Sequence, residues 1–265
     1  MATPFDFTGR VVLVTGGGSG LGLATATRFA EGGARVVIND LREDAALAAA
    51  DGLGPQHVGI GGDVASEQDV VRMVDAAHAL EGRLDVVVNN AGIPDAFKPT
   101  VDIEFSYWQR MLDIHLSGTF LVSQAAARHM IADGTSGAII NISSIGGVVG
   151  LPWRTSYSTA KAGISMMTRV LGCEWGAQGI RVNAVAPGYI ETPMTRGLID
   201  SGVIDTNRIR RRTPMGQWGK PGHIADAITF LASDQAAFIT GVTLPVDGGY
   251  MAYGAPGDAF IIEED

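Results

Sequence analysis

Short runs of β-branched residues recur along the chain, and a stretch long enough for a helix separates each run from the next. Because these runs are apolar throughout, they predict strands covered on both faces, as in a parallel sheet between helices. The predicted strands span residues 10–15, 34–40, 57–63, 84–92, 136–144, 179–188 and 241–249. Their alternation with helical segments predicts an α/β fold, a doubly wound parallel sheet of about seven strands with helices on both faces.

Two stretches depart from this regular alternation. In residues 189–220, Pro193, Pro214 and several glycines interrupt the helical pattern. Irregular segments of this length are typically lids or binding loops, so this stretch is a predicted substrate-binding loop. Residues 250–265 form a predicted C-terminal extension, whose aromatic and Ile side chains are expected to pack on a neighbouring subunit or border a pocket. Since no linker divides the rest, residues 1–265 are predicted to form a single domain.

Composition excludes several classes of partner. The net charge of -9 disfavours nucleic acid, because binding a polyanion requires a basic surface. The first ten residues lack a basic region followed by an apolar one, and no later stretch is apolar enough to span a membrane. These features predict a cytoplasmic protein that binds neither nucleic acid nor membrane, and no metal site is predicted. The single cysteine, Cys173, is predicted to be buried within a helix.

A glycine-rich turn, TGGGSGLG at residues 15–22, joins the first predicted strand to a helix. Glycines there allow a tight turn that brings backbone N–H groups and a helix N-terminus against a diphosphate. The spacing differs from the Gly-x-Gly-x-x-Gly fingerprint, and a glycine cluster alone also fits a flexible turn. Its position between strand and helix nevertheless predicts a Rossmann-type dinucleotide site. The residues expected to bind the cofactor in this turn are Gly16, Ser19, Gly20, Leu21 and Gly22.

Asp40, at the end of the second predicted strand, bears on the choice of cofactor. A carboxylate there accepts hydrogen bonds from the adenosine ribose hydroxyls and repels a 2′-phosphate, which favours NAD over NADP. Ser19 and Leu41 agree, because neither supplies the positive charge that a 2′-phosphate requires. Arg42 keeps dual specificity open, and Asp40 as a simple turn residue is the alternative. Asp63 and Val64, after the third strand, are expected either to contact the adenine or to cap the strand end.

Five motifs occur in a fixed order: TGGGSGLG (15–22), NNAG (89–92), NISS (141–144), YSTAK (157–161) and PGYIET (187–192). With them, the chain from about residue 8 to residue 250 resembles the short-chain dehydrogenase/reductase family. The resemblance implies a nicotinamide-dependent oxidoreductase, usually a homotetramer, with Ser144, Tyr157 and Lys161 as catalytic residues. It further implies cofactor contacts from Tyr157 and Lys161 and from Asn90, Ala91, Gly92, Pro187, Gly188, Ile190 and Thr192.

The spacing of Tyr157 and Lys161 supports this chemistry independently. Residues four apart on a helix face the same way, so the phenol and the ammonium can meet. Moving a hydride between a carbinol carbon and nicotinamide requires an acid or base at the oxygen. A tyrosine hydroxyl ordinarily titrates near pH 10, and a neighbouring cation stabilises its ionised form. Ser144, at a strand end, is expected to hold the substrate oxygen.

The sequence departs from the family pattern at His115, where relatives usually have Asn. In relatives that Asn joins a water chain from the lysine to solvent. Histidine binds water and titrates near neutrality, so His115 is a candidate for the same proton relay. The alternative is a helix histidine with no kinetic role.

The expected substrate pocket is mostly apolar, which suits a cyclic or medium-sized secondary alcohol or ketone. Trp153 fits the core or a subunit contact equally well. The basic run RIRRR at 208–212 is predicted to be a solvated helix face, with binding of a carboxylate, phosphate or carrier protein as the alternative. The residues expected to line the pocket are Pro94, Gly146, Val149, Trp153, Tyr189 and Met194.

The sequence therefore predicts an NAD-dependent oxidoreductase that interconverts a secondary alcohol, cyclic or sugar-like, and its ketone, with Tyr157 as general acid/base. One alternative is a 3-oxoacyl-thioester reductase that uses NADPH. A second, of another class, is a non-catalytic NAD-binding regulatory protein, against which the intact Ser144, Tyr157 and Lys161 argue.

Overall fold

The protein was analysed as a computed structural model that describes residues 5–200, 202 and 204–259. Its centre is a seven-stranded parallel sheet with the order β3-β2-β1-β4-β5-β6-β7. This arrangement confirms the predicted doubly wound fold, and each strand lies within the range predicted for it. The strands are β1 (Val11–Val14), β2 (Arg35–Asp40), β3 (Val58–Gly61), β4 (Val86–Asn89), β5 (Gly137–Ile142), β6 (Ile180–Pro187) and β7 (Thr243–Val246).

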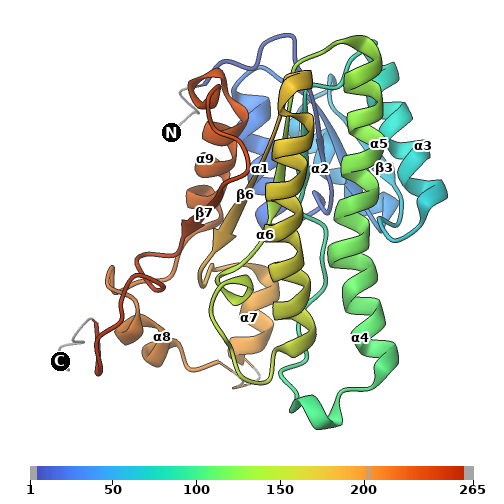
Figure 1. The fold of residues 1–265 in the computed structure, drawn as a ribbon. Coiled ribbons are helices and arrows are strands. Elements are labelled where there is room, and N and C mark those ends of the chain that lie inside the picture. The colour runs from blue at the N-terminus through green and yellow to red at the C-terminus, as the bar shows by residue number, and fades with distance from the viewer. Residues whose placement is uncertain (1–4, 201, 203, 260–265) are drawn as a thin grey trace.

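Helices cover both faces of the sheet (Figure 1). One face packs against α1 (Gly20–Glu31), α2 (Glu43–Leu53) and α9 (Pro221–Ala232), and the other against α3 (Glu67–Ala79), α5 (Gly118–Asp133) and α6 (Thr155–Trp175). The remaining helices are α4 (Phe105–Leu112), α7 (Pro193–Asp200) and α8 (Thr206–Arg212). Short helical turns are η1 (Thr100–Asp102), η2 (Asp113–Ser117), η3 (Ile145–Gly147), η4 (Gly176–Gln178) and η5 (Asp234–Ala236).

Alternate side chains of each strand enter opposite layers of the core. In β1, Val12 and Val14 lie in the layer with α1 and α9, whereas Val11 and Leu13 lie in the layer with α3 and α5. All four are fully buried, which explains why the strand reads as an unbroken apolar run. No helix in the described part of the chain is long and apolar enough to cross a membrane.

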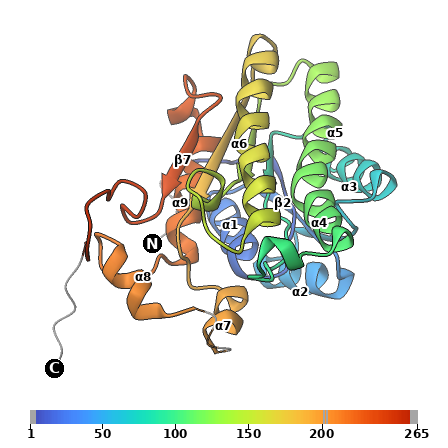
Figure 2. The same cartoon turned by 60° about the horizontal axis from the view of Figure 1, so that its bottom comes forward.

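The sheet order changes direction at β1, which lies between β2 and β4. Such a switch point leaves a crevice outside the carboxyl ends of the strands, where doubly wound proteins bind ligands. The turns after β1, β4, β5 and β6 all open at this edge. In Figure 2, where the bottom of the molecule comes forward, α7 and α8 lie at the same end.

The predicted substrate-binding loop at 189–220 is more regular than expected, because α7 and α8 form within it. The basic run in α8 is predicted to face solvent, but Arg212 within it contacts another part of the chain. Arg212 stacks on Tyr250 and Tyr253, with its guanidinium carbon 4.9 and 5.0 Å from the ring centres. The same guanidinium donates hydrogen bonds to the backbone oxygens of both tyrosines. The basic run therefore holds the described part of the predicted C-terminal extension, whose last residues, 260–265, lie outside the described range.

Cys173 is exposed, contrary to the prediction. Its neighbours Leu171 and Gly172 are buried in α6, but Cys173 falls on the helix face that points away from the sheet. A helix turns about 100° per residue, so adjacent positions in an apolar stretch need not share an environment.

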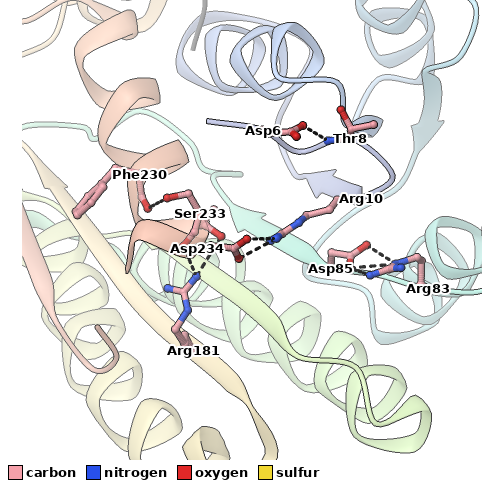
Figure 3. Close-up of polar contacts among 10 residues, drawn as sticks. Asp6, Thr8, Arg10, Arg83, Asp85, Arg181, Phe230, Ser233 and Asp234 are labelled. Carbon is pink, nitrogen blue, oxygen red and sulfur yellow. Dashed lines mark hydrogen bonds and ion pairs between the residues drawn. The ribbon is translucent and has the colours of Figure 1, made fainter. Parts of the chain in front are cut away.

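Arginine side chains tie the amino edge of the sheet to the end of α9 (Figure 3). Arg181 of β6 donates hydrogen bonds to three backbone oxygens at the C-terminus of α9, those of Leu231, Ala232 and Ser233. Arg10 forms a two-pronged ion pair with Asp234, at 2.7 and 2.8 Å. Terminal carbonyls of a helix lack partners within the helix and attract cations, so Arg181 supplies both hydrogen bonds and favourable charge.

We predict that Arg181→Met will lower the free energy of unfolding by about 2–3 kcal/mol, because partly buried helix carbonyls lose a charged donor. Urea denaturation followed by far-UV circular dichroism measures the change. The matched control is Arg128→Met, on an exposed position of α5, which should stay within about 0.5 kcal/mol of the parent. Equal losses in the two variants would contradict the capping role of Arg181.

Candidate active site

Two cavities meet at the carboxyl edge of the sheet, and both are lined in part by Gly92 and Ile93. The first, of about 220 Å³, contains Ser144, Tyr157 and Lys161 in its wall. The second, of about 560 Å³, lies beside Asp40. Every residue predicted to bind the cofactor lines one of the two. The first cavity takes Ser19, Gly20, Leu21, Gly22, Asn90, Pro187, Gly188, Ile190 and Thr192, and the second takes Gly16, Asp63, Val64 and Ala91.

The turn after β1 is built so closely that only glycine fits at two of its positions. A Cβ on Gly22 would lie 2.2 Å from the carbonyl oxygen of Gly16, and one on Gly16, whose φ is +61°, would lie 2.8 Å from the Cα of Ala91. Asn90 holds the turn by donating to the carbonyl oxygens of Thr15 and Gly16, at 2.9 and 3.0 Å. The first residues of α1 therefore face the first cavity, where their unpaired N–H groups suit a diphosphate.

Asp40 is fixed at the rim of the second cavity by two backbone N–H groups. Gly18 donates to one carboxylate oxygen at 3.1 Å and Arg42 donates to the other at 3.2 Å. The carboxylate is half-buried and cannot swing away without losing these bonds. Sequence reasoning missed the opposite wall of this cavity, formed by Ser106, Gln109 and Arg110 of α4, because the chain alone does not indicate which helix will face β2.

Asp63 lines the same cavity and also caps the turn that follows β3. One of its carboxylate oxygens accepts a hydrogen bond from the N–H of Ala65 at 2.9 Å. The strand-end cap considered for Asp63 is therefore present, and Val64 beside it is buried against the same wall.

Three predicted catalytic residues lie together in the first cavity, carried by the turn between β5 and η3 and by α6. Lys161 is buried, its Nζ donates to the carbonyl oxygen of Ile142 at 2.7 Å, and Nζ lies 5.6 Å from the ring centre of Tyr157. Burial lowers the pKa of Lys161 to about 7. The Oγ of Ser144 accepts a hydrogen bond from the N–H of Gly146 at 3.1 Å, which leaves its own proton available. Ser143 points elsewhere and bonds the Lys161 carbonyl, as expected for a structural residue.

His115 lies in η2, a π-helical turn that joins α4 to α5, and only 3% of it is exposed. Its Nε2 is 3.1 Å from both the N and the O of Ile93, and its ring stands edge-on to the Tyr157 ring at 5.5 Å between centres. A Cβ on Gly92 would lie 2.3 Å from the imidazole, so the bulkier side chain fits only because this position is glycine.

Burial, together with the charge of Lys161, lowers the pKa of His115 to about 3. The expectation that His115 titrates near neutrality is therefore wrong, and the imidazole is neutral at neutral pH. Its Nδ1 is buried without a hydrogen-bond partner among the described residues. A role in proton relay would require a water at Nδ1 rather than a change of charge on the ring.

Most of the predicted substrate-pocket residues lie outside the first cavity, and only Met194 lines it. Trp153 is 62% exposed, and Tyr189 lines a separate cavity with Trp218. Gly146 is buried behind Ser144, where a Cβ would meet Leu151 at 3.3 Å. Neither Pro94 nor Val149 contributes to the first cavity. The apolar wall is instead formed by Ile93, Ile142, Ile190 and Pro193. Of these, the sequence indicated only Ile190, as a cofactor contact.

A glycine turn at a helix N-terminus, beside a switch in strand order, is the architecture of dinucleotide-binding α/β proteins. The family model described as enoyl-(acyl carrier protein) reductase matches residues 16–251. Among curated proteins, the cis-4-hydroxycyclohexanecarboxylate dehydrogenase of Sinomonas cyclohexanicum is 46% identical over 93% of this chain and 98% of its own length. An uncharacterized short-chain type dehydrogenase/reductase of Sinorhizobium fredii is 42% identical over 95% of this chain, which spans only 45% of that relative.

A solved structure is similar to this chain over almost its full length. The short-chain type dehydrogenase/reductase from Mycobacterium marinum superposes with a TM-score of 0.88, at 33% identity, over 94% of this chain and 98% of its own. The chain therefore belongs to the short-chain dehydrogenase/reductase family, as the motifs predicted. It is an oxidoreductase that interconverts alcohols and carbonyl compounds.

We predict that His115→Asn will keep kcat/KM within roughly tenfold of the parent enzyme, because a neutral imidazole and an amide can both hydrogen-bond the Ile93 backbone. The pH profile of the rate should also keep its shape from about pH 5 to 9, since the histidine does not titrate in that range. Initial rates of reduced-nicotinamide formation measure both. A loss as large as that of Tyr157→Phe would assign His115 a specific part in catalysis.

Proposed function

We propose that the protein is an NAD-dependent dehydrogenase of cyclic secondary alcohols. The observation that carries this proposal is the first cavity, where Ser144, Tyr157 and the buried Lys161 share one wall beside the glycine turn. Its remaining surface is mostly apolar, which fits a ring better than a highly charged substrate chain. The relative from Sinomonas cyclohexanicum is named for a substrate in which the reacting hydroxyl is on a cyclohexane ring.

Ser144, Tyr157 and Lys161 have different roles at the reacting oxygen in this proposal. Ser144 donates its hydroxyl proton to that oxygen, because its own acceptor side is taken by the N–H of Gly146. Tyr157 acts as its phenolate, which Lys161 stabilises by its charge, and becomes the neutral phenol when it takes the alcohol proton. Bound NAD⁺ would supply the hydride acceptor, so that the alcohol would lose a hydride from its carbinol carbon and a proton to Tyr157 and become a ketone.

Asp40 supports the choice of NAD in this proposal. A 2′-phosphate beside Asp40 would meet a carboxylate whose position two N–H groups fix. The nearby Leu41 is exposed and apolar and offers no compensating charge. Ribose hydroxyls, in contrast, would donate hydrogen bonds to the same carboxylate.

The chain is further proposed to act as a cytoplasmic homotetramer. Large apolar side chains are exposed on α4, α5 and α6, as at sites of contact between subunits. These residues are Phe105 of α4, Phe120 and Ile131 of α5, and Met166 and Val170 of α6. Burial of these side chains between subunits would remove them from water.

The alternative of a 3-oxoacyl-thioester reductase is less well supported. In that function the basic run of α8 would meet an acidic carrier, but Arg212 is engaged with Tyr250 and Tyr253. Arg210 likewise donates to the carbonyl oxygen of Gly216. These arginines therefore hold the protein's own backbone.

We predict that the purified protein will reduce NAD⁺, measured by absorbance of the reduced nicotinamide, with cyclohexanol-type substrates in a panel of secondary alcohols. Tyr157→Phe should lower kcat by at least roughly a thousandfold, since the phenolic oxygen proposed to take the proton is lost. Tyr253→Phe is the matched control and should retain activity, because Tyr253 lies outside the first cavity and its hydroxyl donates to the backbone oxygen of Asp258. Tight binding of NAD without turnover of any alcohol or ketone would favour the regulatory protein instead.

We predict that Asp40→Ala will raise the KM for NAD by roughly tenfold and reduce the preference for NAD over NADP by roughly tenfold to a hundredfold, because hydrogen bonds to the ribose and repulsion of the 2′-phosphate are both lost. The control is Asp44→Ala, which removes an equal charge from an exposed position in the first turn of α2. Unchanged cofactor preference in Asp40→Ala would show that other residues select the cofactor.

A further inference from the structure

A second cation lies beside the proposed catalytic phenol. Arg154 immediately precedes α6, and its guanidinium carbon is 4.5 Å from the ring centre of Tyr157 and 4.7 Å from that of Phe97. The guanidinium is therefore held between two aromatic rings, an arrangement that fixes its plane. Nothing in the proposed proton transfer uses this group.

A buried carboxylate fixes one edge of the guanidinium. The Nε of Arg154 donates to Asp95 at 2.9 Å, and the side chain of Asp95 is only 4% exposed. The other oxygen of Asp95 accepts from the N–H of Ala96 at 2.9 Å and faces the hydroxyl of Tyr107 at 3.4 Å. Asp95 is thus satisfied on both oxygens and acts as an anchor for Arg154.

The opposite edge of the guanidinium has no partner. A guanidinium carries five N–H donors, and Arg154 uses only the one on Nε among the described residues. The Arg154 side chain retains 14% exposure, so the remaining donors are within reach of a ligand. An edge with two parallel N–H groups matches the geometry of a carboxylate.

The guanidinium lies over the face of the Tyr157 ring, which itself lines the first cavity. Burial raises the pKa of Tyr189, the first residue of the predicted substrate-binding loop, and the charge of Arg154 opposes that rise. Arg154 is therefore within electrostatic reach of both the proposed catalytic ring and the loop expected to cover the substrate.

The two segments that build this arrangement are strained. Phe97 and Trp153 have φ values of +48° and +67°, in the left-handed region that side chains other than glycine rarely adopt. The N–H of Lys98 donates to the carbonyl oxygen of Trp153 at 3.0 Å and joins the two segments. Strain of this kind is found at ligand clamps, where the surrounding structure holds it.

We propose that Arg154 binds a carboxylate of the substrate, so that the preferred substrate is a hydroxy acid whose carboxylate is separated from the carbinol carbon by several bonds. This inference rests on the proposed dehydrogenase function and adds the substrate class. Arg154 is then a specificity-determining residue: it selects acids over neutral alcohols of the same shape and leaves the proton transfer to Tyr157.

The test compares 4-hydroxycyclohexanecarboxylate with its methyl ester, which has the same ring but no charge. The parent enzyme should prefer the acid by roughly tenfold to a hundredfold in kcat/KM, and Arg154→Gln should lose this preference. The loss should fall mainly on KM for the acid, whereas kcat/KM for the ester should change by less than about threefold. Arg208→Gln, on an exposed arginine of α8, is the control and should leave both substrates unaffected.

A second variant controls for a loss of stability, because Arg154→Gln leaves the buried Asp95 carboxylate without its cation and could destabilise the protein. Arg154→Gln combined with Asp95→Asn removes both charges, and it should show the same loss of acid preference with a melting temperature near that of the parent. An equal fall in kcat/KM for acid and ester in both variants would overturn the proposal and make Arg154 a positioning residue for Tyr157. A parent enzyme that uses the ester as well as the acid would also overturn it.

Binding separates failure of this proposal from failure of the proposed function. Calorimetric titration of the NAD-saturated protein with cyclohexanecarboxylate, which has no hydroxyl to react, should give a dissociation constant that Arg154→Gln weakens by roughly tenfold or more. Absence of turnover with such binding intact would contradict the dehydrogenase function alone. Turnover of alcohols without such binding would contradict the carboxylate site alone.

Discussion

The candidate site depends on one buried ammonium group. Lys161 lies in the interior between α6 and β5, and its Nζ donates to the carbonyl oxygen of Ile142 at the end of that strand. Burial makes its charged form expensive and lowers its pKa to about 7, so its charge acts on neighbouring groups with little screening by water. The placement of Tyr157 one turn earlier on the same helix follows from helical geometry once Lys161 is anchored.

The two ends of the sheet differ in whether their polar groups are hydrogen-bonded within the protein. At the amino edge, Arg10 and Arg181 pair with Asp234 and with the last carbonyls of α9, so polar groups are satisfied within the protein. At the carboxyl edge, the N–H groups that begin α1 and one edge of the Arg154 guanidinium face cavities or solvent instead of protein acceptors. Satisfied groups stabilise the fold, whereas the open ones at the carboxyl edge are available to ligands.

His115 illustrates how neighbouring positions constrain one another. Its imidazole takes space that any side chain at position 92 would need. Its Nε2 lies within hydrogen-bond distance of both the N–H and the carbonyl oxygen of Ile93, and its tautomer determines which of the two it bonds. The π-helical turn brings the ring to this position, and insertions of this type are common near functional sites. The imidazole at position 115 is therefore accommodated by Gly92 and by the π-helical winding of η2, and it is neutral at neutral pH.

The sequence by itself determined the sheet, the glycine turn and the grouping of Ser144, Tyr157 and Lys161. Apolar runs specify buried strands, and short-range spacing specifies which groups share a helix face, as for Tyr157 and Lys161. Only the tertiary structure decided the wall of the substrate cavity, the pKa of His115 and the partners of the basic run. Each of these depends on segments far apart in the chain, such as Arg154 meeting Asp95 or Arg212 meeting Tyr250. Such contacts produce no periodic pattern of residues in the sequence. Their geometry is set by how separate helices and loops pack together, and not by the spacing of neighbouring residues.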